Sequence, residues 1–278
     1  MKSGFTAATA LALAIAATTA SAGVVISQEQ VNQTGAQKTD QTVMVQGHKQ
    51  KLIDGDREFV TDLDAGTIYI INPKRKEYFQ PKFPPTGMLA MRMIFGGSTI
   101  ELKKSGSTEK VAGYACQDYT GGAILAMHSV NVTQCVASDA PGAKEFAEFE
   151  KLFEQKLKGS PVARKGEIPD GIPVSSSVTT ASVPFKAPPG FPPAAAEEFN
   201  KKIAGHKPNI ITTTVSQIEV KDLPADTFVV PAGYTKGKDI EMPPNPLIRG
   251  THALPHGAAP GAGAAPAAPA APAAPAAH

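Results

Sequence analysis

Residues 67–79 read TIYIINPKRKEYF, and this stretch decides the fold class. A run of β-branched and aromatic residues at 67–71 is followed by Asn72-Pro73-Lys74 and then by a second short run at 76–79. Asn and Pro favour a tight turn, whereas the residues on both sides favour extended backbone. The stretch therefore predicts a β-hairpin.

Strand-like runs and turn signals continue to alternate on both sides of this hairpin. On its N-terminal side, Asp54-Gly55-Asp56 and Asp64-Ala65-Gly66 separate the runs, which predicts an antiparallel meander. Farther along, Ser105-Gly106-Ser107 and Gly121-Gly122 are also interpreted as turns. The fold class is accordingly mainly β (α+β). The predicted strands are residues 24–31, 42–46, 58–61, 67–71, 76–79, 99–103, 111–120, 130–137, 172–182, 210–220 and 227–230.

Residues 139–159 are predicted to form a long amphipathic helix. Asp139 is placed to cap the helix, Pro141 lies in its first turn, and Gly159 ends it. Its large apolar residues recur at helical spacing. They are Phe146, Phe149, Leu152, Phe153 and Leu157.

Residues 86–95 form a compact apolar segment that is rich in methionine. Its large apolar side chains cover too many helical phases for a surface helix, so the segment is either a short buried helix or a flap over an apolar ligand. Methionine repacks readily around varied apolar shapes, which makes these residues the candidate ligand-binding set. They are Met88, Leu89, Met91, Met93, Ile94 and Phe95.

The first 22 residues have the pattern of a secretory signal peptide. Lys2 precedes an apolar run at 7–17, and the small residues Ala20-Ser21-Ala22 follow. The apolar run is shorter than the ~20 residues that span a bilayer, and Gly23 rather than a lipid-accepting Cys comes next. We expect cleavage before Gly23, no membrane anchor, and a periplasmic or extracellular location.

Residues 23–240 are predicted to form a single β-rich domain. A Pro-rich insert at 183–209, with a short helix near 194–203, interrupts its last strands. Residues 241–278 are rich in Ala and Pro, with Pro at every third position from 266 to 275. Such a composition lacks apolar bulk to bury and predicts a disordered spacer.

The charge balance and the motifs exclude several classes of function. The chain has 27 Lys and Arg and 25 Asp and Glu, a net charge of 27 − 25 = +2, so nucleic acid is not an expected partner. The histidines lack zinc-ligand spacing, and the paired aspartates fit turns better than calcium loops. A nucleophile elbow, a phosphate loop and a dinucleotide fingerprint are all missing. The sequence predicts no metal, no cofactor and no catalytic residue, and hence a protein that is not an enzyme.

Cys116 and Cys135 are the only cysteines in the sequence. In an exported chain, two cysteines that are nineteen positions apart favour a disulfide over a redox or metal pair, with two buried thiols as the alternative. If they pair across a hairpin, residues 121–129 must be its loop. A tight turn at Gly121-Gly122 would instead set Cys116 opposite Met127.

Four stretches occur in a recognisable order and spacing: Thr67-Ile68-Tyr69-Ile70-Ile71 running into Lys76-Glu77-Tyr78, then Val111-Ala112-Gly113-Tyr114-Ala115-Cys116, then Gly171-Ile172-Pro173-Val174, and finally Phe228-Val229-Val230-Pro231-Ala232-Gly233-Tyr234. Together they resemble the exported bacterial family catalogued as domain of unknown function 4412. The resemblance implies a fold similar to the periplasmic lipoprotein carriers, in which a strongly curved antiparallel sheet forms a half-barrel with helices on its concave face. The family has no established activity, so the resemblance implies no catalytic residue.

These observations lead to two hypotheses about function. The first is a soluble exported protein that holds an apolar ligand, such as a lipid acyl chain, in a half-barrel covered by the segments at 86–95 and 139–159. The second is a structural or interaction module of the cell envelope. Its concave face would be filled by its own side chains, and its tail at 241–278 would space it from a protein or polymer partner.

Overall fold

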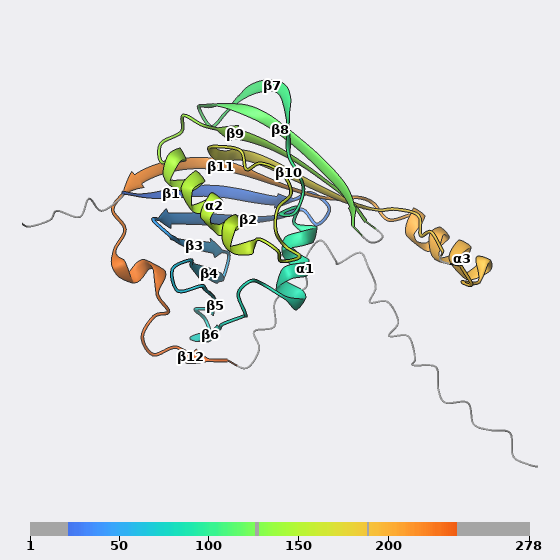
Figure 1. Cartoon of the computed structure of the whole chain (residues 1–278), viewed down its shortest axis with the longest axis horizontal. Helices are drawn as coiled ribbons and strands as arrows, with labels where there is room; N and C mark the ends of the chain where they lie inside the picture. The colour runs from blue at the N-terminus through green and yellow to red at the C-terminus, as the bar shows by residue number, and fades with distance from the viewer. Residues whose placement is uncertain (1–21, 126–127, 188, 238–278) are drawn as a thin grey trace, which may run out of the picture.

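The computed structural model describes residues 22–125, 128–187 and 189–237, in which twelve strands form one open sheet (Figure 1). The prediction of a mainly β fold is therefore confirmed. The strand order along the sheet is β12-β6-β5-β4-β3-β2-β1-β11-β10-β9-β8-β7. Neighbouring strands are antiparallel, except that β12 runs parallel to β6. The strands are β1 (Gly23–Asn32), β2 (Gln37–Gln46), β3 (Lys49–Asp54), β4 (Arg57–Asp62), β5 (Thr67–Asn72), β6 (Glu77–Phe79), β7 (Lys103–Val111), β8 (Tyr114–Leu125), β9 (His128–Ala137), β10 (Ile172–Ser182), β11 (Asn209–Lys221) and β12 (Thr235–Lys236).

The sheet consists of two meanders, which meet where β1 pairs with β11. Strands β1 to β6 pair in sequence order, and strands β7 to β11 do the same. β11 then pairs with the whole of β1, from Gly23 opposite Lys221 to Asn32 opposite Ile211. Because β1 and β11 lie side by side in the interior of the sheet, both halves of the chain can contribute to one site.

The described residues also form three α-helices and one 3-10 helix. These are α1 (Gly87–Phe95), α2 (Ala143–Leu157), α3 (Pro193–Ala204) and η1 (Ala225–Phe228). Helix α2 lies across one face of the sheet near β1 and β2, whereas α3 lies well beyond the ends of β10 and β11 (Figure 1).

Helix α2 starts where the chain comes very close to β1. Gly142 precedes the helix with a φ of +76°, and a Cβ at this position would lie 2.6 Å from a methyl group of Val24. Only glycine combines this positive φ with such a close approach. The prediction that Asp139 caps the helix is wrong, because the helix begins only at Ala143 and no side chain caps it.

Both faces of the N-terminal half of the sheet are covered, by different parts of the chain. Val45 of β2 belongs to a buried cluster that includes Phe149 of α2. The preceding residue, Met44, points to the opposite face because side chains alternate along a strand. There it packs against a second cluster that contains Ile71 and Phe228 of η1. Helix α2 thus covers one face, and the segment around η1 covers the other.

The predicted strands differ from the structure in three places, and two of the differences have a clear physical reason. The strand predicted at 99–103 shares only Lys103 with β7. Residues 227–230 were predicted as a strand, but residues 225–228 form η1, because Phe228 is buried against the sheet face rather than paired at its edge. Strand β3 was missed because its sequence, KQKLID, is rich in charge. Its Lys51 forms a half-buried ion pair with Glu58 of β4 at 2.9 Å, which lets a charged residue occupy a central strand.

Two predicted turns lie inside strands. Ser105-Gly106-Ser107 falls within β7, at a register shift between Lys104 and Thr108. Gly121-Gly122 falls within β8, and a Cβ at residue 121 would collide with the backbone oxygen of Glu101. Glycine is needed at residue 121 for the close approach of another segment and not for a turn.

Candidate functional site

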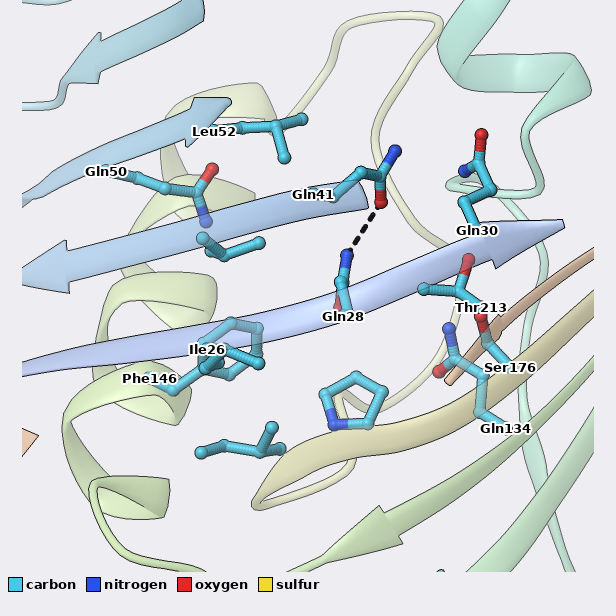
Figure 2. A pocket seen from close by; sticks show the side chains of 13 residues that line it. Ile26, Gln28, Gln30, Gln41, Gln50, Leu52, Gln134, Phe146, Ser176 and Thr213 are labelled. Carbon is cyan, nitrogen blue, oxygen red and sulfur yellow. Dashed lines mark hydrogen bonds between the residues drawn. The ribbon is translucent and has the colours of Figure 1, made fainter. Parts of the chain in front are cut away.

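A cavity of about 350 Å³ lies on the sheet face that α2 covers (Figure 2). Six strands and α2 contribute to its lining, and the strands are β1, β2, β3, β9, β10 and β11. Six of the thirteen lining residues are apolar. They are Ile26, Val43, Leu52, Phe146, Ile172 and Pro173.

The remaining lining residues are polar and uncharged, and five of them are glutamines. Strand periodicity places them on this face, because residues two apart on β1 continue from Ile26 to Gln28 and Gln30. Their side chains approach one another from several strands in Figure 2. The polar lining residues are Gln28, Gln30, Gln41, Gln50, Gln134, Ser176 and Thr213.

Strand register brings these polar groups into one band. Gln28 lies opposite Gln41 on β2, and Gln30 lies opposite Thr213 on β11. Thr213 lies opposite Ser176 on β10, which in turn lies opposite Gln134 on β9. Since directly opposed residues share a face, the band crosses from one half of the chain to the other.

Gln28 and Gln41 belong to a chain of hydrogen bonds that ends on a carboxylate. The Gln28 Nε2 group donates to Gln41 Oε1 at 2.8 Å (Figure 2), and Gln41 Nε2 donates to Asp54 Oδ1 at 3.1 Å. Gln41 is only 7% exposed, so this side chain is held in the sheet rather than in solvent. These hydrogen bonds therefore fix the orientation of the Gln28 amide in the polar wall of the cavity.

Within the described part of the chain, the ionisable groups lie outside the cavity lining. On α2 and the segment after it, burial raises the pKa of Glu150, while the nearby Arg164 opposes this effect. The Arg164 backbone N–H donates to Glu154 Oε2 at 2.9 Å, and its guanidinium Nε lies 3.6 Å from Glu154 Oε1. This cluster ties the segment to α2 and has no group in the cavity.

A second charged group stabilises the turn between β4 and β5. Partial burial would raise the pKa of Asp62, but hydrogen bonds from the Ala65 and Asp64 backbone N–H groups and the ammonium of Lys49 lower it on balance. The distances to its oxygens are 2.9 Å from Ala65 N, 3.0 Å from Asp64 N and 3.0 Å from Lys49 Nζ. The aspartate acts here in turn formation, as its place in the sequence suggested.

The methionine-rich segment forms α1, and its described side chains do not line the cavity. Ala90, Met93 and Ile94 pack instead in a cluster with Leu157 at the end of α2. Leu89 is half-buried and Met91 is 43% exposed, whereas the side chains of Met88 and Phe95 lie outside the described part of the structure. Ligand binding by this segment stays a prediction.

The predicted disulfide between Cys116 and Cys135 is confirmed, with the two Cα atoms 5.3 Å apart. The prediction of a long loop at residues 121–129 is wrong. β8 continues to Leu125 and β9 begins at His128, with Asp118 opposite Cys135. The disulfide therefore joins two residues that are not directly opposite each other on β8 and β9. The prediction of a long loop had assumed that the two cysteines were directly opposed.

Sequence reasoning missed the glutamine band, although one signal for it was present. In β1 the residues of one face run Val24, Ile26, Gln28 and Gln30, so an apolar face becomes an amide face partway along a strand. Gln41, Gln50 and Gln134 gave no such signal, because only strand pairing brings them beside β1.

Comparisons with known proteins add little to this geometry. No family model matches the chain, and a search of curated proteins finds no match. Two solved structures titled "Structure of PNGF-II", in the P21 and C2 space groups, are similar over 78% of the chain with 10% and 8% identity. Their TM-scores are 0.32 and 0.34, and the chain covers 31% of each of them, so the likeness carries no argument about function.

Among the described residues, no helix is both long and apolar enough to cross a membrane.

Proposed function

We propose that this chain is an exported, non-catalytic binding protein for a neutral amphiphile, a lipid-like molecule that joins an apolar chain to an uncharged hydrogen-bonding group. The observation that carries the proposal is the cavity of about 350 Å³, with an apolar part and an amide part and no ionisable lining residue. Its volume lies in the range of small-molecule sites. The proposal needs no cofactor.

The apolar part of the cavity suits a hydrocarbon chain. Ile26 and Val43 come from the sheet, and Phe146 comes from α2 above it. In this proposal the sheet acts as a half-barrel and α2 covers part of its concave face. Helix α1 braces the end of α2 through the cluster around Leu157.

The polar part of the cavity selects against charge. Amide side chains both donate and accept hydrogen bonds, so they match hydroxyl, ester and amide groups. A carboxylate in this site would lose hydration without meeting a cation, which is strongly unfavourable. We therefore expect neutral lipids to bind and fatty acid anions to be excluded, which narrows the apolar ligand that the sequence suggested.

The test is native mass spectrometry of the purified protein, followed by displacement of an environment-sensitive apolar fluorophore. Decanol should displace the dye and decanoate should not. Ser176→Trp should fill the cavity and abolish dye uptake. Ser177→Trp is the matched control, because the adjacent side chain points to the opposite face of β10. Absence of both a co-purifying lipid and dye uptake would refute the proposal.

A second candidate, an interaction module of the cell envelope, has one structural observation in its favour. An arm whose described residues are 183–187 and 189–208 leaves the sheet between β10 and β11 and carries α3 away from it (Figure 1). The arm is ordered by its own contacts, since the Phe185 ring lies 5.2 Å from Phe191 and 5.6 Å from Phe199. Phe191 remains 39% exposed, which leaves part of its ring available to a partner.

This second candidate would also use the tail at 241–278, which lies outside the described residues. It predicts a partner that is retained by the full chain and lost when residues 242–278 are deleted or when Phe191→Ser is introduced. Dye uptake by the cavity should be unchanged in both variants. A partner that is lost with Ser176→Trp instead would favour the ligand-binding proposal.

A further inference from the structure

The hydrogen-bond chain through Gln28, Gln41 and Asp54 has a direction that chemistry alone determines. The Asp54 carboxylate has only acceptor atoms, so Gln41 must turn its Nε2 group toward it. Gln41 then presents Oε1 to Gln28, and Gln28 must donate its Nε2 group in turn. The orientation of both glutamine amides therefore follows from the Asp54 carboxylate, which ends this series of hydrogen bonds.

This direction leaves the Gln28 carbonyl oxygen at the cavity wall without a hydrogen-bond partner among the described residues. We infer that Gln28 Oε1 is a fixed hydrogen-bond acceptor that selects ligands with a hydroxyl or N–H group over otherwise similar ligands without one. The inference rests on the proposed function, since it concerns the ligand of the same cavity. It adds which kind of polar group the ligand must present and which residue recognises it.

The other glutamines of the lining do not impose such a choice. Within the described residues, the side chains of Gln30, Gln50 and Gln134 have no hydrogen-bond partner. An amide without a partner can turn either its oxygen or its nitrogen toward a ligand. Selection for a donor should therefore depend on Gln28 and on the carboxylate that orients it.

Decanol and decyl methyl ether form a matched pair of probes, because methylation removes the only donor and leaves the chain unchanged. In the wild-type protein the bound ether would leave the Gln28 oxygen without a partner. The dissociation constant measured by dye displacement should then be about tenfold higher for the ether than for the alcohol.

Asp54→Asn tests the origin of this preference. An asparagine can donate as well as accept, so both glutamines can reverse and Gln28 can offer either atom to the ligand. The ratio of the two dissociation constants should fall to about twofold or less. Asp56→Asn is the matched control from the same hairpin. Its exposed carboxylate pairs with Lys74 at 3.2 Å and takes no part in the chain, so the ratio should stay near tenfold.

Gln28→Met provides a second variant that removes the acceptor while keeping a side chain of similar length. It should bind the dye and lose the preference for the alcohol. Equal binding of alcohol and ether by the wild-type protein would overturn this inference alone, and so would a preserved preference in Asp54→Asn. Failure of the dye and of both probes to bind would overturn the proposed function together with it.

Discussion

Removing the disulfide between Cys116 and Cys135 should destabilise the protein substantially. The bond joins residues with a sequence separation of 19, so it closes a loop of this length in the unfolded chain. The chain-entropy relation for a loop of this size predicts a stabilisation of about 3 kcal/mol at 25 °C. The sulfur atoms are also well packed, because the two residues are 4% and 2% exposed.

The assay is equilibrium unfolding in urea, with the oxidised wild-type protein compared with the double variant Cys116→Ala/Cys135→Ala. We expect the free energy of unfolding to fall by about 3 kcal/mol. The dependence on urea should become steeper, since the unfolded chain without the cross-link exposes more surface. A reducing agent should lower the stability of the wild-type protein and leave that of the double variant unchanged.

A loss below about 1 kcal/mol would refute this reasoning. It would mean that the unfolded chain already holds β8 and β9 close together, so that the bond removes little entropy from it. The ladder of hydrogen bonds between these two strands does not depend on the bond. We therefore expect the double variant to keep its strand content, as measured by far-ultraviolet circular dichroism.

Three further predictions concern other parts of the structure. Gly121→Ala should destabilise the protein by about 1–3 kcal/mol in the same urea assay, because the new Cβ collides with backbone; Gly205→Ala, in open space, should have little effect. Phe149→Ala should cost about 3–5 kcal/mol, since its fully buried ring joins α2 to the sheet, and retention of wild-type stability would contradict that role. Asp62→Asn should lower stability by about 0.5–1 kcal/mol at neutral pH. The lowered pKa of Asp62 means that its ionised form is stabilised by folding, so the difference from wild type should shrink as the pH falls through that pKa, and a difference independent of pH would contradict the assignment.

The fold class could be predicted from the sequence because its signals are local. The hairpin at residues 67–79 needs only a β-branched run and turn residues between the strands, and β4, β5 and β6 form with this connectivity. The disulfide could also be predicted, since the sequence has only two cysteines and the expected export would favour their oxidation. The hairpin depends only on residues that are close in sequence, and the disulfide has only one possible pairing within the chain because there are two cysteines.

The candidate site could not be predicted, because it depends on which strands become neighbours. Gln28 and Gln134 are more than a hundred positions apart, and only the pairing of β1 with β11, and of β10 with both β11 and β9, brings them to one cavity. The same reason explains Gly121, whose local sequence indicates a turn while a distant segment requires a residue without a side chain. The sequence by itself determined a β-rich chain with a disulfide. The tertiary structure alone decided that the cavity is lined by amides, because strand register selects which side chains share a face.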